Sequence, residues 1–165
     1  KRSALIEEAV KSALDQLVEM RLTEGRSLQK DVLERVDDIE RCTDGIIKKR
    51  DEQTDTLLGK LKEKIGRILA DMEVDPQRLL TEAAILAERS DISEEITRLK
   101  SHMEQLRELI GGGGSVGRKV EFILQEINRE ANTISSKSSL YGINRLVVEM
   151  KSNIEKLREQ AANIE

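Results

Sequence analysis

The chain has 165 residues, of which 36% are charged and 1% are aromatic, and its formal net charge is −4. This composition is typical of a helical protein whose core is built from Leu, Ile, Val and Ala. The single cysteine, Cys42, excludes an internal disulfide and a cysteine-based zinc site. No run approaches the ~20 apolar residues of a membrane helix, and the first residues show no secretory pattern. We therefore expect a cytoplasmic protein, and the start at Lys1 rather than Met suggests part of a longer one.

Charge is distributed unevenly along the chain. Residues 115–158 hold eight Lys or Arg and five acids, a surplus of +3, whereas residues 1–114 carry −5 and residues 159–165 carry −2. A surplus of three charges is ordinary, so by itself it does not indicate an anionic partner.

The first half of the chain predicts long helices. Residues 3–22 carry one apolar stripe, and Gly25 is a candidate bend. From Leu28 to Met72 apolar residues recur in steps of three, four and seven, which is typical of a coiled-coil-like arm. The stripe is interrupted at "KKRDEQTDT", residues 48–56, which contains neither proline nor glycine. The helix either continues there as a solvated stretch or folds back as two helices, and the pattern leaves both open.

Shorter helices are expected in the second half. Asp75 before Pro76 is a helix start, Asp91 with Glu94 resembles a capping box, and Ser115 is a candidate N-cap after the "GGGG" loop. The expected ranges are 76–89, 91–110, 117–137 and 144–164, the third ending at "SSKSS". No strand pattern appears. We therefore predict an all-α fold, with a helical arm over residues 1–74 and a small helical C-terminal domain over residues 75–165.

The helix that starts near Asp91 carries a polar row beside its apolar stripe. A rotation of about 100° per residue places the row, Asp91, Glu95, Arg98 and His102, within one sector of about 60°. The neighbouring stripe consists of Ile92, Ile96, Leu99, Met103 and Leu106. The pattern alone favours a ladder of ion pairs worth a few tenths of a kcal/mol each. The competing hypothesis is a metal or acid–base site, because carboxylates and imidazole are ligands that divalent cations take.

The helix expected at 117–137 combines an apolar side with three polar rows. Its apolar side is Val120, Ile123, Leu124, Ile127, Ala131 and Ile134. The rows expected on the opposite side are Glu121, Gln125, Asn128 and Asn132; Arg118, Phe122 and Arg129; and Glu126 and Glu130. Amides are weak helix formers without charge, so they indicate specific hydrogen bonding. For Phe122 we expect burial by a neighbouring helix or subunit rather than base stacking, since a lone aromatic is a poor stacking platform.

Three segments carry a family resemblance. "VGRKVEFILQEINREANTISSKS", together with "AERSDISEEITRLKSHMEQLREL" and "VVEMKSNIEKLREQAANIE", closely resembles the C-terminal part of the bacterial YicC/YloC proteins. The resemblance is collinear from Leu79 to Glu165, and "QEINREANT" is its specific core. Residues 1–77, including "RLTEGRSL", resemble the helical middle of the family more loosely. Family members are longer and carry an N-terminal domain of strands and helices, most or all of which we expect this sequence to lack.

The resemblance implies an endoribonuclease that cleaves single-stranded RNA with a divalent cation, Mn²⁺ or Mg²⁺. It also implies a ring-like homo-oligomer, for which six subunits are expected. By resemblance, the catalytic candidates are Glu95, His102, Glu126 and Glu130, and the metal candidates are Asp91, Glu95, Glu126 and Glu130. The RNA-binding candidates are Arg98, Arg118, Phe122, Gln125, Asn128, Arg129, Asn132 and Lys137.

Two mechanisms and one non-catalytic function remain open at this point. Carboxylates that bind one or two metal ions would activate water, while Arg118, Arg129 and Lys137 would bind phosphates. Alternatively, His102 would act as the general base on the RNA 2′-hydroxyl without a metal, with an arginine stabilising the transition state. The alternative function is a non-catalytic helical oligomerisation or RNA-adaptor module.

Overall fold

The computed structural model describes residues 2–71, 76–112 and 117–161, and these form five helices. They are α1 (Arg2–Asp71), α2 (Pro76–Ser90), α3 (Ser93–Gly112), α4 (Gly117–Lys137) and α5 (Tyr141–Ala161). Strands are absent from these residues, so the all-α prediction is confirmed.

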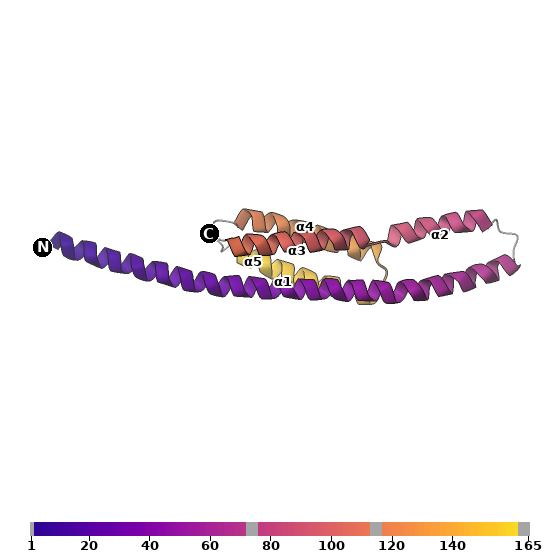
Figure 1. Ribbon diagram of the computed structural model, residues 1–165, viewed down its shortest axis with the longest axis horizontal. Helices are drawn as coiled ribbons and strands as arrows, with labels where there is room; N and C mark the ends of the chain where they lie inside the picture. The colour runs from indigo at the N-terminus through magenta and orange to yellow at the C-terminus, as the bar shows by residue number, and fades with distance from the viewer. Residues whose placement is uncertain (1, 72–75, 113–116, 162–165) are drawn as a thin grey trace.

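Helix α1 is continuous over 70 residues and spans the length of the molecule (Figure 1). It passes through the candidate bend at Gly25 and through the charged stretch at 48–56. Of the two alternatives for that stretch, the continuous helix is therefore the one observed. A single glycine costs a helix only about 1 kcal/mol relative to alanine, so Gly25 does not end one of this length.

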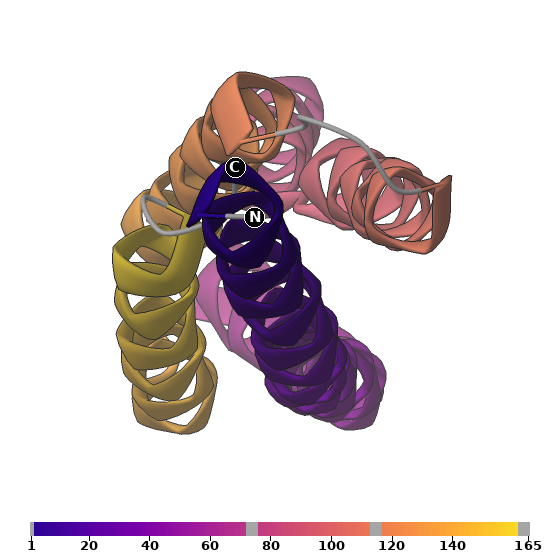
Figure 2. The same cartoon turned by 90° about the vertical axis from the view of Figure 1, so that its left-hand side faces the viewer.

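The core lies in a four-helix bundle made by the middle of α1 with α3, α4 and α5. Helix α1 packs against α3 and α5, and α4 packs against the other sides of the same two helices. Neighbouring helices run in opposite directions (Figures 1 and 2). Val32, Val36, Ile39, Cys42 and Ile46 of α1 are buried in the same cluster as the apolar stripes of α3, α4 and α5. The division of the chain at residue 74 stays a prediction, but the core draws on both sides of it.

Polar contacts between α1 and α3 fix the position of α3 along the bundle. Arg107 Nε donates to Glu40 Oε1 at 3.0 Å, and the Arg107 guanidinium also pairs with Asp37. Gln29 Nε2 donates to the carbonyl oxygen of Ile110 at 3.0 Å. The two acids raise the pKa of Arg107 above its ordinary value. Because these contacts restrain α3 along the bundle axis, they also restrain which α3 residues face α4.

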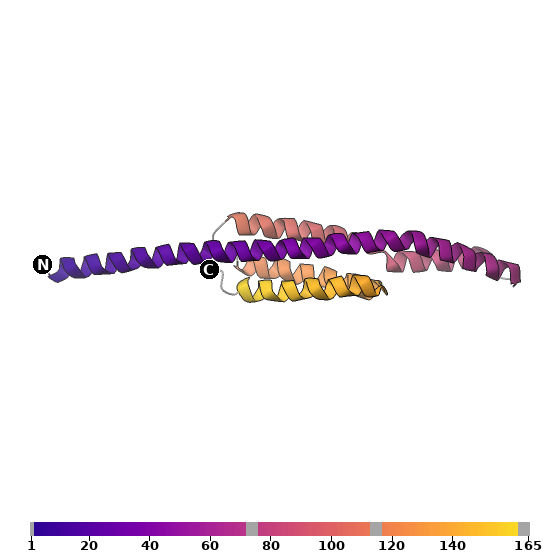
Figure 3. The same cartoon turned by 90° about the horizontal axis from the view of Figure 1, so that it is seen from below.

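The chain extends beyond the bundle at both ends. Residues before Leu28 project from one end, and the last part of α1 lies beyond the other end beside α2 (Figures 1 and 3). The projecting part of α1 exposes the apolar side chains Leu5, Ile6, Val10, Leu14, Leu17, Val18, Met20 and Leu22. A coiled-coil partner for this arm stays a prediction.

The helix boundaries agree with the sequence except at the last helix. Helices α2, α3 and α4 begin and end within two residues of the predicted ranges. Helix α5 begins at Tyr141 rather than near Asn144, because the Leu140 carbonyl already accepts from the backbone amides of Ile143 and Asn144. The predicted caps Asp75 and Ser115, and residues 162–164 of the predicted last helix, lie outside the described residues.

The bundle, rather than the projecting arm, should carry the stability of a single chain. Leu124 is 0% exposed and Leu22 is 57% exposed, so the same substitution tests both parts. Leu124→Ala should lower the free energy of unfolding in urea by about 2–5 kcal/mol, since it leaves a cavity in the core. Leu22→Ala should change it by less than about 0.5 kcal/mol. A comparable loss at Leu22 would contradict this and would mean that the arm is buried in solution.

Candidate functional site

Three predicted site residues meet where α3 faces α4. His102 of α3 and Glu126 and Glu130 of α4 each offer a ligand atom, and these atoms lie within 4.8 Å of one another. Glu126 and Glu130 are one turn apart on α4, so their side chains lie next to each other on one face of the helix. We call these three residues the His102 cluster. In the described part of the chain it is the one group of three such side chains close enough to share a metal ion.

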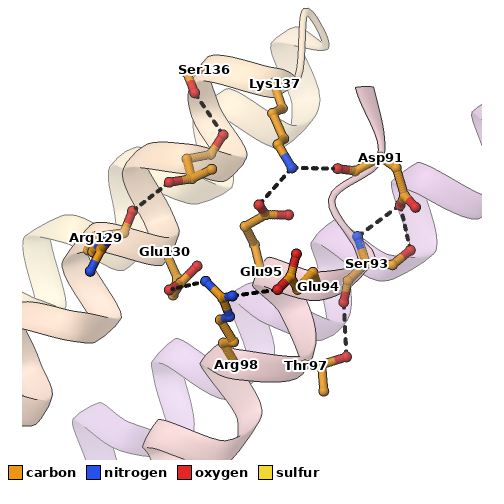
Figure 4. Close-up of polar contacts among 11 residues, drawn as sticks. Asp91, Ser93, Glu94, Glu95, Thr97, Arg98, Arg129, Glu130, Ser136 and Lys137 are labelled. Carbon is orange, nitrogen blue, oxygen red and sulfur yellow. Dashed lines mark hydrogen bonds and ion pairs between the residues drawn. The ribbon is translucent and has the colours of Figure 1, made fainter. Parts of the chain in front are cut away.

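The His102 cluster lies at the border of the core, and its polar atoms are weakly paired. Glu130 is 4% exposed, and its ion pair with Arg98 has an Nη1–Oε1 distance of 3.6 Å (Figure 4). Glu126 is half-buried, and its ion pair with Arg129 also has an N–O distance of 3.6 Å. The buried Nδ1 of His102 has no hydrogen-bond partner among the described residues. Such a buried, unsatisfied group costs about 1–3 kcal/mol, which a bound ligand can recover.

The position of Glu126 and Glu130 corrects the sequence analysis. Their row was expected on the side of the helix opposite the core, but Glu130 is buried and Glu126 is half-buried. The reason is that α4 packs against both α3 and α5, so its buried arc is wider than its apolar stripe. The acids therefore lie at the border of the core, next to Ile123 and Ile127.

A second polar group, close to the first, holds the end of α4 against the start of α3. Lys137 Nζ donates to Glu95 Oε1 at 2.7 Å and to the carbonyl oxygen of Asp91 at 3.0 Å (Figure 4). The hydrogen bond to Glu95 raises the pKa of Lys137. Glu95 is 6% exposed, and its Oε2 is buried without a hydrogen-bond partner among the described residues. In this conformation Lys137, predicted to bind phosphate, neutralises Glu95.

Asp91 stabilises the first turn of α3. Its Oδ1 accepts from the backbone N of Ser93 at 2.9 Å and from Ser93 Oγ at 2.6 Å, and these bonds lower the pKa of Asp91. Glu94 does not complete the predicted capping box. It pairs instead with Arg98, whose guanidinium lies between Glu94 and Glu130 (Figure 4). Asp91 and Glu95 lie outside the His102 cluster, and a metal-binding role for them stays a prediction.

The remaining candidates on α4 divide by exposure. Arg118, Phe122, Gln125 and Arg129 are exposed, and Asn128 is half-buried. Asn132 is exposed, and its Oδ1 accepts from Lys151 Nζ of α5 at 3.0 Å, so this amide also connects two helices. Phe122 is 64% exposed. Burial by another helix of the same chain is therefore not observed among the described residues, and burial by another subunit stays a prediction.

Three further residues that lie beside the His102 cluster were not predicted from the sequence. On α3, Gln105 and Glu108 lie three and six residues after His102. On α4, Lys119 lies one turn before Ile123. All three residues line a hollow between α3 and α4. The polar row of α3 ends at His102, and extending it by three more residues would have identified Gln105. Lys119 could not be found that way, because only the register of α3 against α4 brings it to this edge.

These features define an all-α protein with an antiparallel four-helix bundle and a histidine–carboxylate cluster on one helix pair. The family model for the C-terminal domain of YicC-like endoribonucleases matches residues 46–165, and the chain belongs to this family. The predicted resemblance is thereby confirmed.

Curated relatives match nearly the whole chain. The probable endoribonuclease YicC of Clostridioides difficile (strain 630) is 44% identical over 163 residues, which are 98% of this chain and 56% of the relative. The probable endoribonuclease YicC of Haemophilus influenzae (strain ATCC 51907 / DSM 11121 / KW20 / Rd) is 37% identical over 153 residues, 92% of this chain and 52% of the relative. The chain thus spans about half the length of these relatives. Among the described residues, no helix combines the length and the apolar character that crossing a membrane requires.

The Lys137–Glu95 pair should behave as a coupled unit in stability measurements. Lys137→Met leaves the buried Glu95 carboxylate without its cation, so it should lower the urea midpoint more than the double change Glu95→Gln with Lys137→Met. The raised pKa of Lys137 fixes the pH dependence. The stabilisation is fully present below the ordinary lysine pKa of about 10.5 and is lost as the pH rises through the higher folded-state value. If the single and double variants unfold at the same midpoint, the pair is not coupled.

Proposed function

We propose that this chain is the helical part of an endoribonuclease that cleaves single-stranded RNA with a divalent cation bound at His102, Glu126 and Glu130. The observation that carries the proposal is the convergence of these three ligands within 4.8 Å around a buried carboxylate. The names of the curated relatives, both probable endoribonucleases, support the same reaction.

The donor set fits the expected metal ions. One imidazole nitrogen and two carboxylate oxygens suit Mn²⁺, and Mg²⁺ is commonly held by one or two carboxylates while keeping several waters. Within the described part of the chain, the Nδ1 of His102 has no hydrogen-bond partner and the ion pairs of Glu126 and Glu130 are long, so few hydrogen bonds must be broken before these groups bind a cation. When bound, such a cation supplies positive charge for the developing phosphorane and lowers the pKa of a bound water.

The arginines at the cluster would then change partners. Arg98 and Arg129 each lie 3.6 Å from one of the cluster carboxylates. Once a cation neutralises these carboxylates, the Arg129 guanidinium and the Nη1 group of Arg98 are available to a phosphate, while Arg98 Nη2 stays paired with Glu94. Asp91 and Glu95 would support the site from the neighbouring turn, through the contact of Lys137 with both residues.

Assembly and location belong to the same proposal. The exposed apolar side chains of the first part of α1 favour a homo-oligomer, in which the arm would be covered by other copies. A hexamer is the expected form, and the cytoplasm is the expected location.

Neutralising one carboxylate of the His102 cluster should reduce RNA cleavage without lowering the stability of the fold. Glu126→Gln should reduce RNA cleavage in the full-length protein at least about 10²-fold, as removal of an essential acid–base or metal group typically does. It should also abolish Mn²⁺ binding in a calorimetric titration, while thermal unfolding stays unchanged because the side chain is only half-buried. Glu121→Gln is the matched control, since Glu121 is an exposed acid on the same helix.

A chelator and a His102 variant distinguish the remaining alternatives. EDTA should abolish wild-type cleavage, and Mn²⁺ or Mg²⁺ should restore it. Cleavage that persists in EDTA but is lost in His102→Asn would support the metal-free route, in which His102 acts as the general base. If the Glu126→Gln and His102→Asn variants both cleave at the wild-type rate, the result favours the non-catalytic adaptor function over the proposed catalytic one.

The 165-residue chain by itself should fold but cleave RNA poorly. Residues 1–114 carry a formal charge of −5, which repels phosphate. The relatives are about twice as long, so we expect their remaining half to supply part of the RNA-binding surface. A gel-based cleavage assay should show a much lower rate for the chain than for the full-length protein. Equal rates would show that this chain contains the whole active site.

A further inference from the structure

A hollow of about 520 Å³ lies between the C-terminal half of α3 and the first two turns of α4. Leu109 and Ile123 form apolar parts of its wall, and Phe122 lies at its side with 64% of its surface exposed. A large aromatic side chain so exposed beside a hollow is unusual, because burying it elsewhere would gain free energy. Phe122 therefore presents a flat apolar surface at the side of the hollow.

The hollow and the His102 cluster share one edge of the bundle. Gln105 lies one turn after His102 on α3, and Phe122 lies one turn before Glu126 on α4. At 1.5 Å per residue, the hollow begins about 5–6 Å from the cluster along the helices. This distance is on the order of one or two nucleotide steps of a stacked strand, at about 3.4 Å each.

The polar groups around the hollow suit a nucleotide. Arg118 and Lys119 supply two cations for the phosphates on either side of a base. Gln105 offers an amide donor and acceptor, and Glu108 offers carboxylate acceptors, for the hydrogen-bonding edge of the base. Phe122 offers a ring on which any base can stack. An apolar helix from a protein partner would leave the two cations beside its apolar face unpaired, so a nucleotide fits this surface better.

We propose that this hollow binds one unpaired nucleobase of the RNA, one or two nucleotides from the phosphate that is cleaved at the His102 cluster. The proposal rests on the proposed function, because it takes RNA as the substrate. It gives a physical reason for selecting single strands, since a base inside a duplex is stacked and paired and cannot reach Phe122.

The test measures binding alone, without metal or cleavage. Labelled single-stranded RNAs, each with one abasic nucleotide at a different position, are titrated with the full-length protein in EDTA and followed by fluorescence anisotropy. For the wild type, one abasic position should raise the Kd at least about fivefold. Phe122→Leu should raise the Kd of the intact RNA by a similar factor and should remove the effect of that abasic position, because the two changes delete the same contact.

Matched variants assign the roles within the hollow. Tyr141→Leu removes an aromatic side chain that is 84% exposed on α5 and should change neither Kd nor the abasic profile. Lys119→Gln should reduce the salt dependence of binding by about one unit of slope. Glu108→Gln should change which base is preferred at the sensitive position and at no other.

Three results would overturn the proposal or separate it from the proposed function. If no abasic position loses its effect in Phe122→Leu, no base stacks there. If Phe122→Leu instead lowers the assembly mass in light scattering and leaves RNA binding unchanged, a second copy of the chain covers the ring. If the coupling between Phe122 and one abasic position is present but Glu126→Gln cleaves at the wild-type rate, the base site stands and the proposed catalytic cluster is wrong.

Discussion

The antiparallel packing of α3 against α4 is the constraint on which the candidate site depends. Leu99, Met103 and Leu106 of α3 and the apolar stripe of α4 are buried in one core, so a slide of either helix would expose apolar surface or leave cavities. The contacts of Arg107 and Gln29 with α1 add a second restraint on the same register. With the register fixed, the polar row beside the α3 stripe must face the acidic row beside the α4 stripe. The site is therefore a consequence of core packing and not of a loop.

Along the side of the bundle where α3 faces α4, the ion pairs become longer from the end of α4 towards its middle. At the end of α4, Lys137 contacts Glu95 at 2.7 Å and also binds the backbone of Asp91, so the charges there are neutralised within the chain. One to two turns away, Arg98 and Glu130 lie at 3.6 Å, and the Nδ1 of His102 is unpaired among the described residues. Tight pairing favours a structural role, because the charges are already compensated, although Oε2 of Glu95 has no hydrogen-bond partner among the described residues. Loose pairing of buried groups leaves lone pairs that a cation or a substrate can use.

The sequence predicts the local features of this protein better than the tertiary ones. Capping residues and apolar periodicity predict α2, α3 and α4 and the buried stripes of α3 and α4, because these depend on local helix geometry alone. It does not decide whether α1 continues through residues 48–56, since a charged stretch without proline or glycine suits a solvated helix and a turn alike. It also misplaces Glu130, whose burial requires that α4 have two neighbours. The family resemblance supplies the candidate residues, but which acids converge with His102 depends on the register of α3 against α4.

The size of the edge limits how tightly one chain could bind the proposed RNA substrate. From Glu95 to Leu109 the edge is about 20 Å long, and its exposed cations are few: Arg98, Arg118, Lys119 and Arg129. Four phosphate contacts would give binding that weakens steeply with salt and is modest at physiological ionic strength. Useful affinity would then require more surface, either from the half of the relatives that lies beyond this chain or from several copies of the same edge. In an oligomer, each copy would carry this edge. An RNA strand bound at one copy would meet the site of the next copy at a high effective concentration. The exposed apolar arm of α1 and the small size of the edge proposed to bind RNA are thus connected, because assembly through the arm would supply the affinity that the edge alone lacks.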